Sequence, residues 1–133
     1  MFEGKPLEVD ITKKADGVFL VVLRGRIDSD TYTEMEERVK PILLSATRVI
    51  ILEMDKVNYV SSAGLGVIFQ MKKFIEGNKG SLIISGLQPH VKKVFEIVRA
   101  LPPQNVFESR EELDKYLDLI QRKEIEKQGG DLV

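Results

Sequence analysis

Two segments near the start of the chain have the apolar pattern of β-strands. Apolar and polar residues alternate over residues 7–11, and residues 18–23 form a run rich in β-branched and aromatic side chains. The turn signal Ala15-Asp16-Gly17 lies between the two segments. We therefore predict a β-hairpin.

A helix is predicted after this hairpin, because the apolar residues between Tyr32 and Leu43 fall on one stripe at helical spacing. Ser29 or Asp30 offers the cap for its first turn. Pro41 interrupts the pattern, since a proline ring in a helix clashes with the carbonyl four residues earlier. The helix is therefore expected to kink or break at Pro41.

The remaining segments alternate between strand and helix patterns. Residues 48–54 form an apolar run typical of a central strand that is covered on both faces. The later predicted elements are a helix over about 62–76 with Gly77 as its C-terminal cap, a strand at 81–85, a helix that starts at Pro89, an edge strand at 105–107 and a helix capped by Ser109.

The resulting order, β-β-α-β-α-β-α-β-α, predicts an α/β fold. We expect a mixed sheet of four or five strands, with the later strands parallel and the helices packed mainly on one face. The sequence contains no repeat. It is expected to form one domain over residues 1–126, followed by a disordered tail over residues 127–133.

Composition excludes several classes of function. The 133 residues include no cysteine, which excludes disulfides, thiolate metal sites and thiol nucleophiles, and His90 is the single histidine. Twenty basic and 21 acidic residues give a formal net charge of -1, so nothing indicates a nucleic-acid or membrane partner. The first 14 residues lack the pattern of a secretory signal, and the longest apolar run, Val18–Leu23, is too short to cross a bilayer. A cytoplasmic protein is expected.

The most informative segment is Val57–Ile68, which joins a predicted strand to a predicted helix, where open α/β sheets place their sites. Ser61 or Ser62 is expected to cap the helix. The small residues of the next turn are Ala63, Gly64 and Gly66. A phosphate on an exposed hydroxyl here would meet free N–H groups and the positive end of the helix dipole. A serine that only caps the helix, with glycines that only allow close packing on the sheet, explains the same residues.

Residues 59–68 (YVSSAGLGVI) resemble the Asp-Ser-Ser/Ala/Thr-Gly-Leu-Gly signature of the anti-sigma factor antagonists, the STAS-domain proteins of bacteria. Gly25-Arg26-Ile27-Asp28 is similar to the family's Gly-x-Leu-Asp, and Glu53 stands where an acidic residue often ends the third strand. Residues 85–98 match the family's strand-loop-helix pattern. The resemblance spans roughly residues 7–118 and implies a STAS-like fold.

The resemblance also implies site residues. In the family, the serine two positions before the first motif glycine accepts a phosphate, and that position here is Ser62. Asp28 matches an acidic loop residue near the phosphorylation site. The motif residues implied to contact a partner are Ser61, Ala63, Gly64, Leu65 and Gly66. The aspartate usually found before the phosphoserine is Ser61 in this chain, and this change either alters recognition by the kinase or leaves Ser61 as a competing acceptor.

The function implied by the resemblance is that of a non-enzymatic anti-sigma factor antagonist without a cofactor. Its unphosphorylated form binds an anti-sigma factor that is also a serine kinase, phosphorylation of Ser62 blocks this binding, and a metal-dependent serine phosphatase restores it. Such a chain is expected to be a monomer or a weak dimer on its own.

Two alternatives stay open. A STAS module that is not phosphorylated could act as a scaffold in a signalling or transport complex, and Ser61 in place of aspartate favours this. An α/β domain could instead bind a small ligand or anion at Ser62, or act on it. Against this, no residues near His90 in the sequence complete a catalytic set, and the loop lacks the lysine of a phosphate-binding P-loop.

Overall fold

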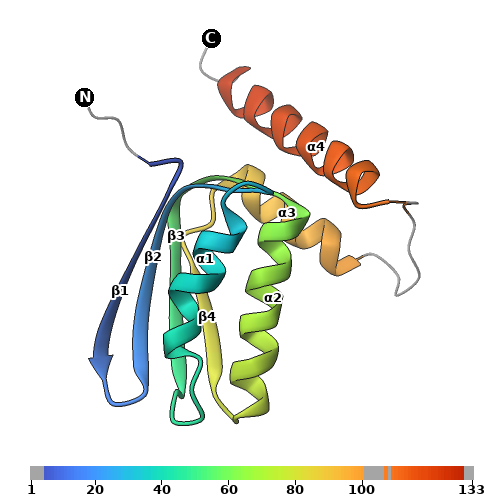
Figure 1. The fold of residues 1–133 in the computed structure, drawn as a ribbon. Coiled ribbons are helices and arrows are strands. Elements are labelled where there is room, and N and C mark those ends of the chain that lie inside the picture. The colour runs from blue at the N-terminus through green and yellow to red at the C-terminus, as the bar shows by residue number, and fades with distance from the viewer. Residues whose placement is uncertain (1–4, 101–106, 108, 131–133) are drawn as a thin grey trace.

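The structure is a computed structural model that describes residues 5–100, 107 and 109–130 (Figure 1). Its elements are β1 (Leu7–Ala15), β2 (Val18–Ile27), α1 (Tyr32–Val39), the 3-10 turn Lys40–Ile42, β3 (Val49–Val60), α2 (Ser62–Gly77), β4 (Ser81–Ser85), α3 (Pro89–Ala100) and α4 (Arg110–Gly130). The four strands form one sheet in the order β1-β2-β3-β4. β1 and β2 are antiparallel, whereas β3 is parallel to both β2 and β4. The predicted hairpin and mixed sheet are therefore confirmed.

One face of the sheet lies beneath α1 and α2, which both stand in front of the strands in Figure 1. Val21 and Leu52 are cross-strand neighbours on this face, and both are fully buried. On the opposite face Ile51 is half-buried and its neighbour Ile83 is 48% exposed. The prediction of helices mainly on one face is thus confirmed. The expectation that residues 48–54 are covered on both faces is wrong, because α1 and α2 both pack on the same side.

The start of α1 differs from the prediction in its cap. Thr31, and neither Ser29 nor Asp30, occupies the N-cap position. The reason is a local turn in which the Asp28 carboxylate accepts hydrogen bonds from the N–H groups of Asp30 (2.9 Å) and Thr31 (3.1 Å), so the helix begins later than predicted, at Tyr32.

The end of α1 follows the prediction. The α-helix stops at Val39, and a 3-10 turn carries Pro41 near its first position. The expected break at the proline is confirmed.

β3 is longer than its apolar run, because β2 supplies backbone partners beyond residue 54. Gly25 pairs with Val57 after one irregularity in the register, and Ile27 pairs with Val60 after a second. The strand therefore ends one residue before Ser61.

Three later elements agree with the prediction, and the C-terminal region differs in part. β4 spans residues 81–85, α3 starts at Pro89, and the Ser109 hydroxyl accepts the Glu112 N–H at 3.1 Å before α4. Asn78 caps α2 in place of Gly77. Of the predicted strand at 105–107, residues 105 and 106 lie outside the described residues, and Phe107 is not in a strand. α4 continues to Gly130, so residues 127–130 of the predicted tail are helical, and residues 131–133 lie outside the described part.

None of the helices formed by the described residues is both long enough and apolar enough to span a bilayer.

Candidate functional site

The loops that follow β2 and β3 are adjacent at one end of the sheet. Ile27 pairs with Val60 at the ends of these parallel strands, and the Ser61 N–H donates to the Ile27 carbonyl at 2.9 Å. Asp28 follows Ile27 directly, and Ser62 follows Ser61. The expectation that Asp28 and Ser62 lie at the same end of the domain is confirmed.

Ser61 is the residue that caps α2. It has an extended backbone, and its Oγ accepts the N–H of Gly64 at 3.3 Å. The residue is 4% exposed. Its hydroxyl is therefore engaged in shaping the loop, as expected for the position that holds aspartate in the family pattern.

The two motif glycines have different environments. A Cβ on Gly64 would lie 2.7 Å from Ile27 Cγ2 and 2.8 Å from the Ile27 carbonyl oxygen, whereas a Cβ on Gly66 would meet nothing within 4 Å. Close packing on β2 thus accounts for Gly64 and does not account for Gly66. Ala63 and Leu65 are also buried. Of the motif residues expected to contact a partner, Gly66 is the one that is only half-buried.

Asp28 is held as an ionised group by local donors. Burial raises the pKa of this carboxyl, but hydrogen bonds from the Asp30 N–H, the Arg26 side chain and the Thr31 side chain outweigh burial and leave the pKa below its ordinary value of 3.8. The Arg26 Nε lies 3.3 Å from Asp28 Oδ2. A negative charge is therefore fixed in the loop next to the start of α2.

This ionisation predicts an acid-dependent loss of stability. Because the folded-state pKa of Asp28 is lowered, its contribution is fully present above the ordinary pKa of 3.8 and is lost as the pH falls through the lowered value. The free energy of unfolding of the unsubstituted chain and of the Asp28→Asn variant is measured with urea from pH 6 to pH 2. At pH 6 the unsubstituted chain should be the more stable of the two. The difference should shrink at the acid end. A difference that stays constant over this range would contradict the role of the charge.

Arg26 and Tyr59 connect the Asp28 loop to α4. The Arg26 guanidinium lies 4.1 Å from the centre of the Tyr59 ring, a cation–π distance. Burial raises the pKa of Tyr59, and the nearby carboxylates of Asp118 and Asp114 on α4 raise it further. The neutral phenol thus lies between a cation of β2 and two carboxylates of α4.

α4 covers the start of α2. The Ser62 N–H donates to Asp114 Oδ1 at 2.8 Å, and Ser62 Oγ is buried with no hydrogen-bond partner among the described residues. In Figure 1, α4 passes across the end of the sheet at which α2 begins. The expectation that the Ser62 hydroxyl is exposed is therefore wrong: its oxygen is buried at the place where α4, a helix distant in sequence, bonds to the backbone of the same residue.

Gln121 is a site residue that sequence reasoning missed. It is 1% exposed, its Oε1 accepts the Val60 N–H at 3.1 Å, and its Nε2 donates to the Val60 carbonyl at 3.0 Å. A signal existed in the sequence: Gln121 lies four residues after Leu117, so it is a polar residue on the apolar stripe of α4.

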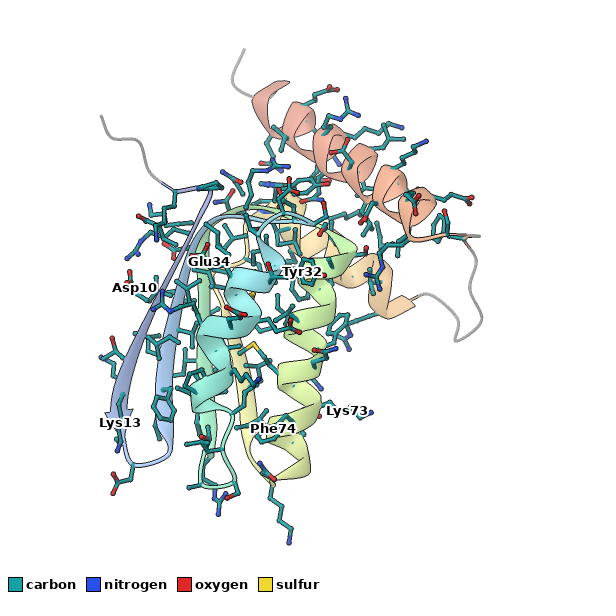
Figure 2. The ribbon with its side chains drawn as sticks, viewed as in Figure 1. Asp10, Lys13, Tyr32, Glu34, Lys73 and Phe74 are labelled. Atoms are coloured by element: carbon teal, nitrogen blue, oxygen red, sulfur yellow. The ribbon has the colours of Figure 1, made fainter. Side chains whose placement is uncertain are left out.

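Other candidate features lie away from Ser62. His90 is buried, and its Nε2 lies 2.6 Å from the Asn58 carbonyl oxygen, which is a structural contact. A groove of about 720 Å³ between α2 and α3 has an apolar floor that includes Phe69 and Phe95, with lysines at its rim. One of these, Lys73, projects from α2 on the side away from α1 (Figure 2). In the described ranges, no group of three or more acidic, histidine or cysteine residues is placed to hold a metal ion.

Known proteins resemble this chain over most of its length. A family model of the STAS domain matches residues 11–113. BtrV of Bordetella bronchiseptica, named as a candidate anti-sigma factor antagonist, is 33% identical over 98 residues, which cover 74% of this chain and 84% of BtrV. The anti-sigma-B factor antagonist of Staphylococcus aureus is 31% identical over 86 residues, which cover 65% of this chain and 80% of that protein.

Solved structures show the same fold. The anti-sigma factor antagonist SpoIIAA in its unphosphorylated form has a TM-score of 0.63 at 18% identity, over 69% of this chain and 81% of that one. The phosphorylated form of the Bacillus cell fate determinant SpoIIAA has a TM-score of 0.59 at 17% identity, over 68% and 83%. The expected STAS-like α/β fold is confirmed.

Proposed function

Because the chain belongs to the STAS-domain family, as its match over residues 11–113 shows, we propose that it is an anti-sigma factor antagonist. In this role it binds an anti-sigma factor in the cytoplasm and so frees a sigma factor for transcription. The names of the two relatives at 33% and 31% identity support this assignment. The chain acts by binding, without a catalytic activity of its own and without a cofactor.

The proposed switch is phosphorylation of Ser62. The observation that supports it best is the position of Ser62 as the first residue of α2, next to the cap Ser61 and at the same end of the sheet as Asp28. A phosphate at the start of a helix is favoured by the N–H groups and the dipole of the first turn. Its charge of about -1.5 to -2 would oppose a protein surface that must approach this end closely.

The kinase in this scheme is the anti-sigma factor itself. Ser62 Oγ attacks the γ-phosphorus of ATP, an O–P bond forms as the bond to ADP breaks, and the hydroxyl proton passes to a base of the kinase. A metal-dependent serine phosphatase hydrolyses the phosphoserine and restores the binding form. The chain acts as a monomer or a weak dimer when it is alone.

The test is to locate the phosphate. Incubation with the cognate anti-sigma factor and ATP, followed by peptide mass spectrometry, should find the label on Ser62. Ser62→Ala should remove the label and keep binding, and Ser62→Asp should weaken binding. Ser61→Ala is the matched control: losing the cap should cost about 1 kcal/mol of stability while the label stays on Ser62. Label on Ser61 alone would contradict the assignment.

A second function is favoured by two observations at the same place. Ser62 Oγ is buried, and the position before it is Ser61 instead of aspartate. Both fit a STAS module that is not phosphorylated and serves as a constitutive scaffold. No label with an active cognate kinase, together with undiminished partner binding, would support the scaffold.

A further inference from the structure

The contact between α4 and the end of the sheet has two polar anchors. Asp114 accepts the Ser62 N–H at 2.8 Å, and Gln121 bonds to both the N–H and the carbonyl of Val60, at 3.1 and 3.0 Å. The two anchors are seven residues apart, which is two helical turns, so they lie on one side of α4. Leu117 lies between them and is fully buried.

The Gln121 contact resembles the pairing of one more strand. Its side-chain amide donates and accepts as a neighbouring backbone would, so the last residue of β3 has its hydrogen bonds satisfied without another strand. Asp114 acts as a second N-terminal cap on α2, because a carboxylate is favoured near the N–H groups of a first turn. Both contacts are specific to the docked position of α4.

The Ser62 hydroxyl is buried at the place where α4 docks. Its oxygen is buried and has no partner among the residues that the structure describes, although the backbone of the same residue is bonded to α4. A kinase must bring a nucleotide phosphate into line with this oxygen. A binding partner that recognises the start of α2 must reach the same surface.

We propose that α4 is an intramolecular lid over Ser62. In the closed form α4 occupies the surface around Ser62, and in the open form α4 has left it, so that kinase and partner gain access. The lid rests on the proposed function in one respect, namely that Ser62 is the residue a kinase modifies.

Phosphorylation and closure exclude each other. A phosphate on Ser62 Oγ would bring about -1.5 to -2 charges beside the Asp114 carboxylate and would compete with it for the same N–H. Two further carboxylates lie close by, Asp118 of α4 next to Tyr59 and Asp28 in the neighbouring loop. The nearby cations are already engaged, Arg122 with Asp118 at 2.8 Å and Arg26 with Asp28 and the Tyr59 ring. The modification therefore holds the chain open.

The lid can be tested without a kinase, because the chain has no cysteine. Ser62→Cys introduces a single thiol at the covered position, and its rate of alkylation by iodoacetamide measures access. Ser29→Cys gives an exposed reference thiol in the Asp28 loop at the same end of the sheet. In the chain of 133 residues, the thiol at position 62 should react at least about tenfold more slowly than the reference, since reaction waits for local opening.

The lid is then loosened by Gln121→Ala in the Ser62→Cys background. In the closed form this change leaves the N–H and carbonyl of Val60 without the Gln121 side chain as their partner, which destabilises the docked position of α4, so alkylation should accelerate at least about fivefold. The charge next to the thiol stays the same, which keeps its pKa comparable. Gln128→Ala makes the same substitution on an exposed part of α4 and should leave the rate unchanged.

Two outcomes would overturn the lid. Alkylation at position 62 as fast as at position 29 would show that α4 does not cover the site. Equal rates for the Gln121→Ala and Gln128→Ala variants would show that the contact with Val60 does not hold α4 in place. Circular dichroism and urea unfolding of each variant exclude global unfolding as the cause of a faster rate.

The same variants separate the lid from the proposed function. The Gln121→Ala variant that keeps serine at position 62 should be phosphorylated faster by the cognate kinase than the unsubstituted chain. The increase should match the one that Gln121→Ala causes in the rate of alkylation. Slow, lid-dependent alkylation without any phosphorylation would leave the lid standing and contradict the proposed function. Fast alkylation together with efficient phosphorylation of Ser62 would contradict the lid and support the proposed function.

Discussion

Replacing Gly64 with alanine is expected to lower the free energy of unfolding by about 1–3 kcal/mol, whereas the same change at Gly66 should raise it by up to about 1 kcal/mol. At position 64 the new methyl group would lie 2.8 Å from the carbonyl oxygen of Ile27, a backbone atom that cannot move without disturbing β2. At position 66 the methyl group would meet nothing, and alanine favours the helix.

Urea denaturation of both variants measures this difference, with the dependence on urea concentration as a check that the same surface unfolds. The pair is matched, since both residues lie in the first part of α2 and receive the same substitution. Similar effects at the two positions would contradict the close packing of Gly64 on Ile27. They would also remove the physical reason for treating the two motif glycines differently.

A larger loss is expected in the core. Leu52→Ala should lower the free energy of unfolding by about 2–5 kcal/mol, because the side chain is fully buried beneath α1 and α2 and its removal leaves a cavity. Ile83→Ala, on the opposite face, should cost well under half as much, since Ile83 is 48% exposed.

Thermal and urea unfolding of these two variants test which face of the sheet is covered. The comparison uses two aliphatic side chains on adjacent parallel strands, β3 and β4. An Ile83→Ala loss as large as that of Leu52→Ala would show that something packs on the opposite face in solution.

The sequence predicted elements whose signals are local. The turn at residues 15–17, the proline at the start of α3 and the serine cap before α4 each act within a few residues, and each has its predicted effect. β3 was predicted too short because its last residues are strand-forming only through pairing with β2, which is a tertiary contact. The cap of α1 was misplaced because the Asp28 turn delays the helix.

The candidate site was predicted only in part, because some of its contacts depend on tertiary packing. Adjacent parallel strands place Asp28 and Ser62 at one end, and this follows from the order of elements. The docking of α4 through Asp114 on Ser62 and Gln121 on Val60 does not follow, because an apolar stripe shows which side of α4 is buried but not against what it packs.

The order of the strands in the sheet has a consequence for folding. It is the order of the strands in the chain, so each strand pairs with the one that precedes it. Only the β1–β2 pair is a hairpin, whereas the parallel pairs join segments far apart in sequence, as Val18 with Val49 and Val49 with Ser81 show. The hairpin closes a short loop, and the two parallel pairs, which close longer loops, are expected to form more slowly. α4 follows all four strands in the sequence. During synthesis the sheet and the start of α2 can therefore assemble before α4 is available to cover Ser62.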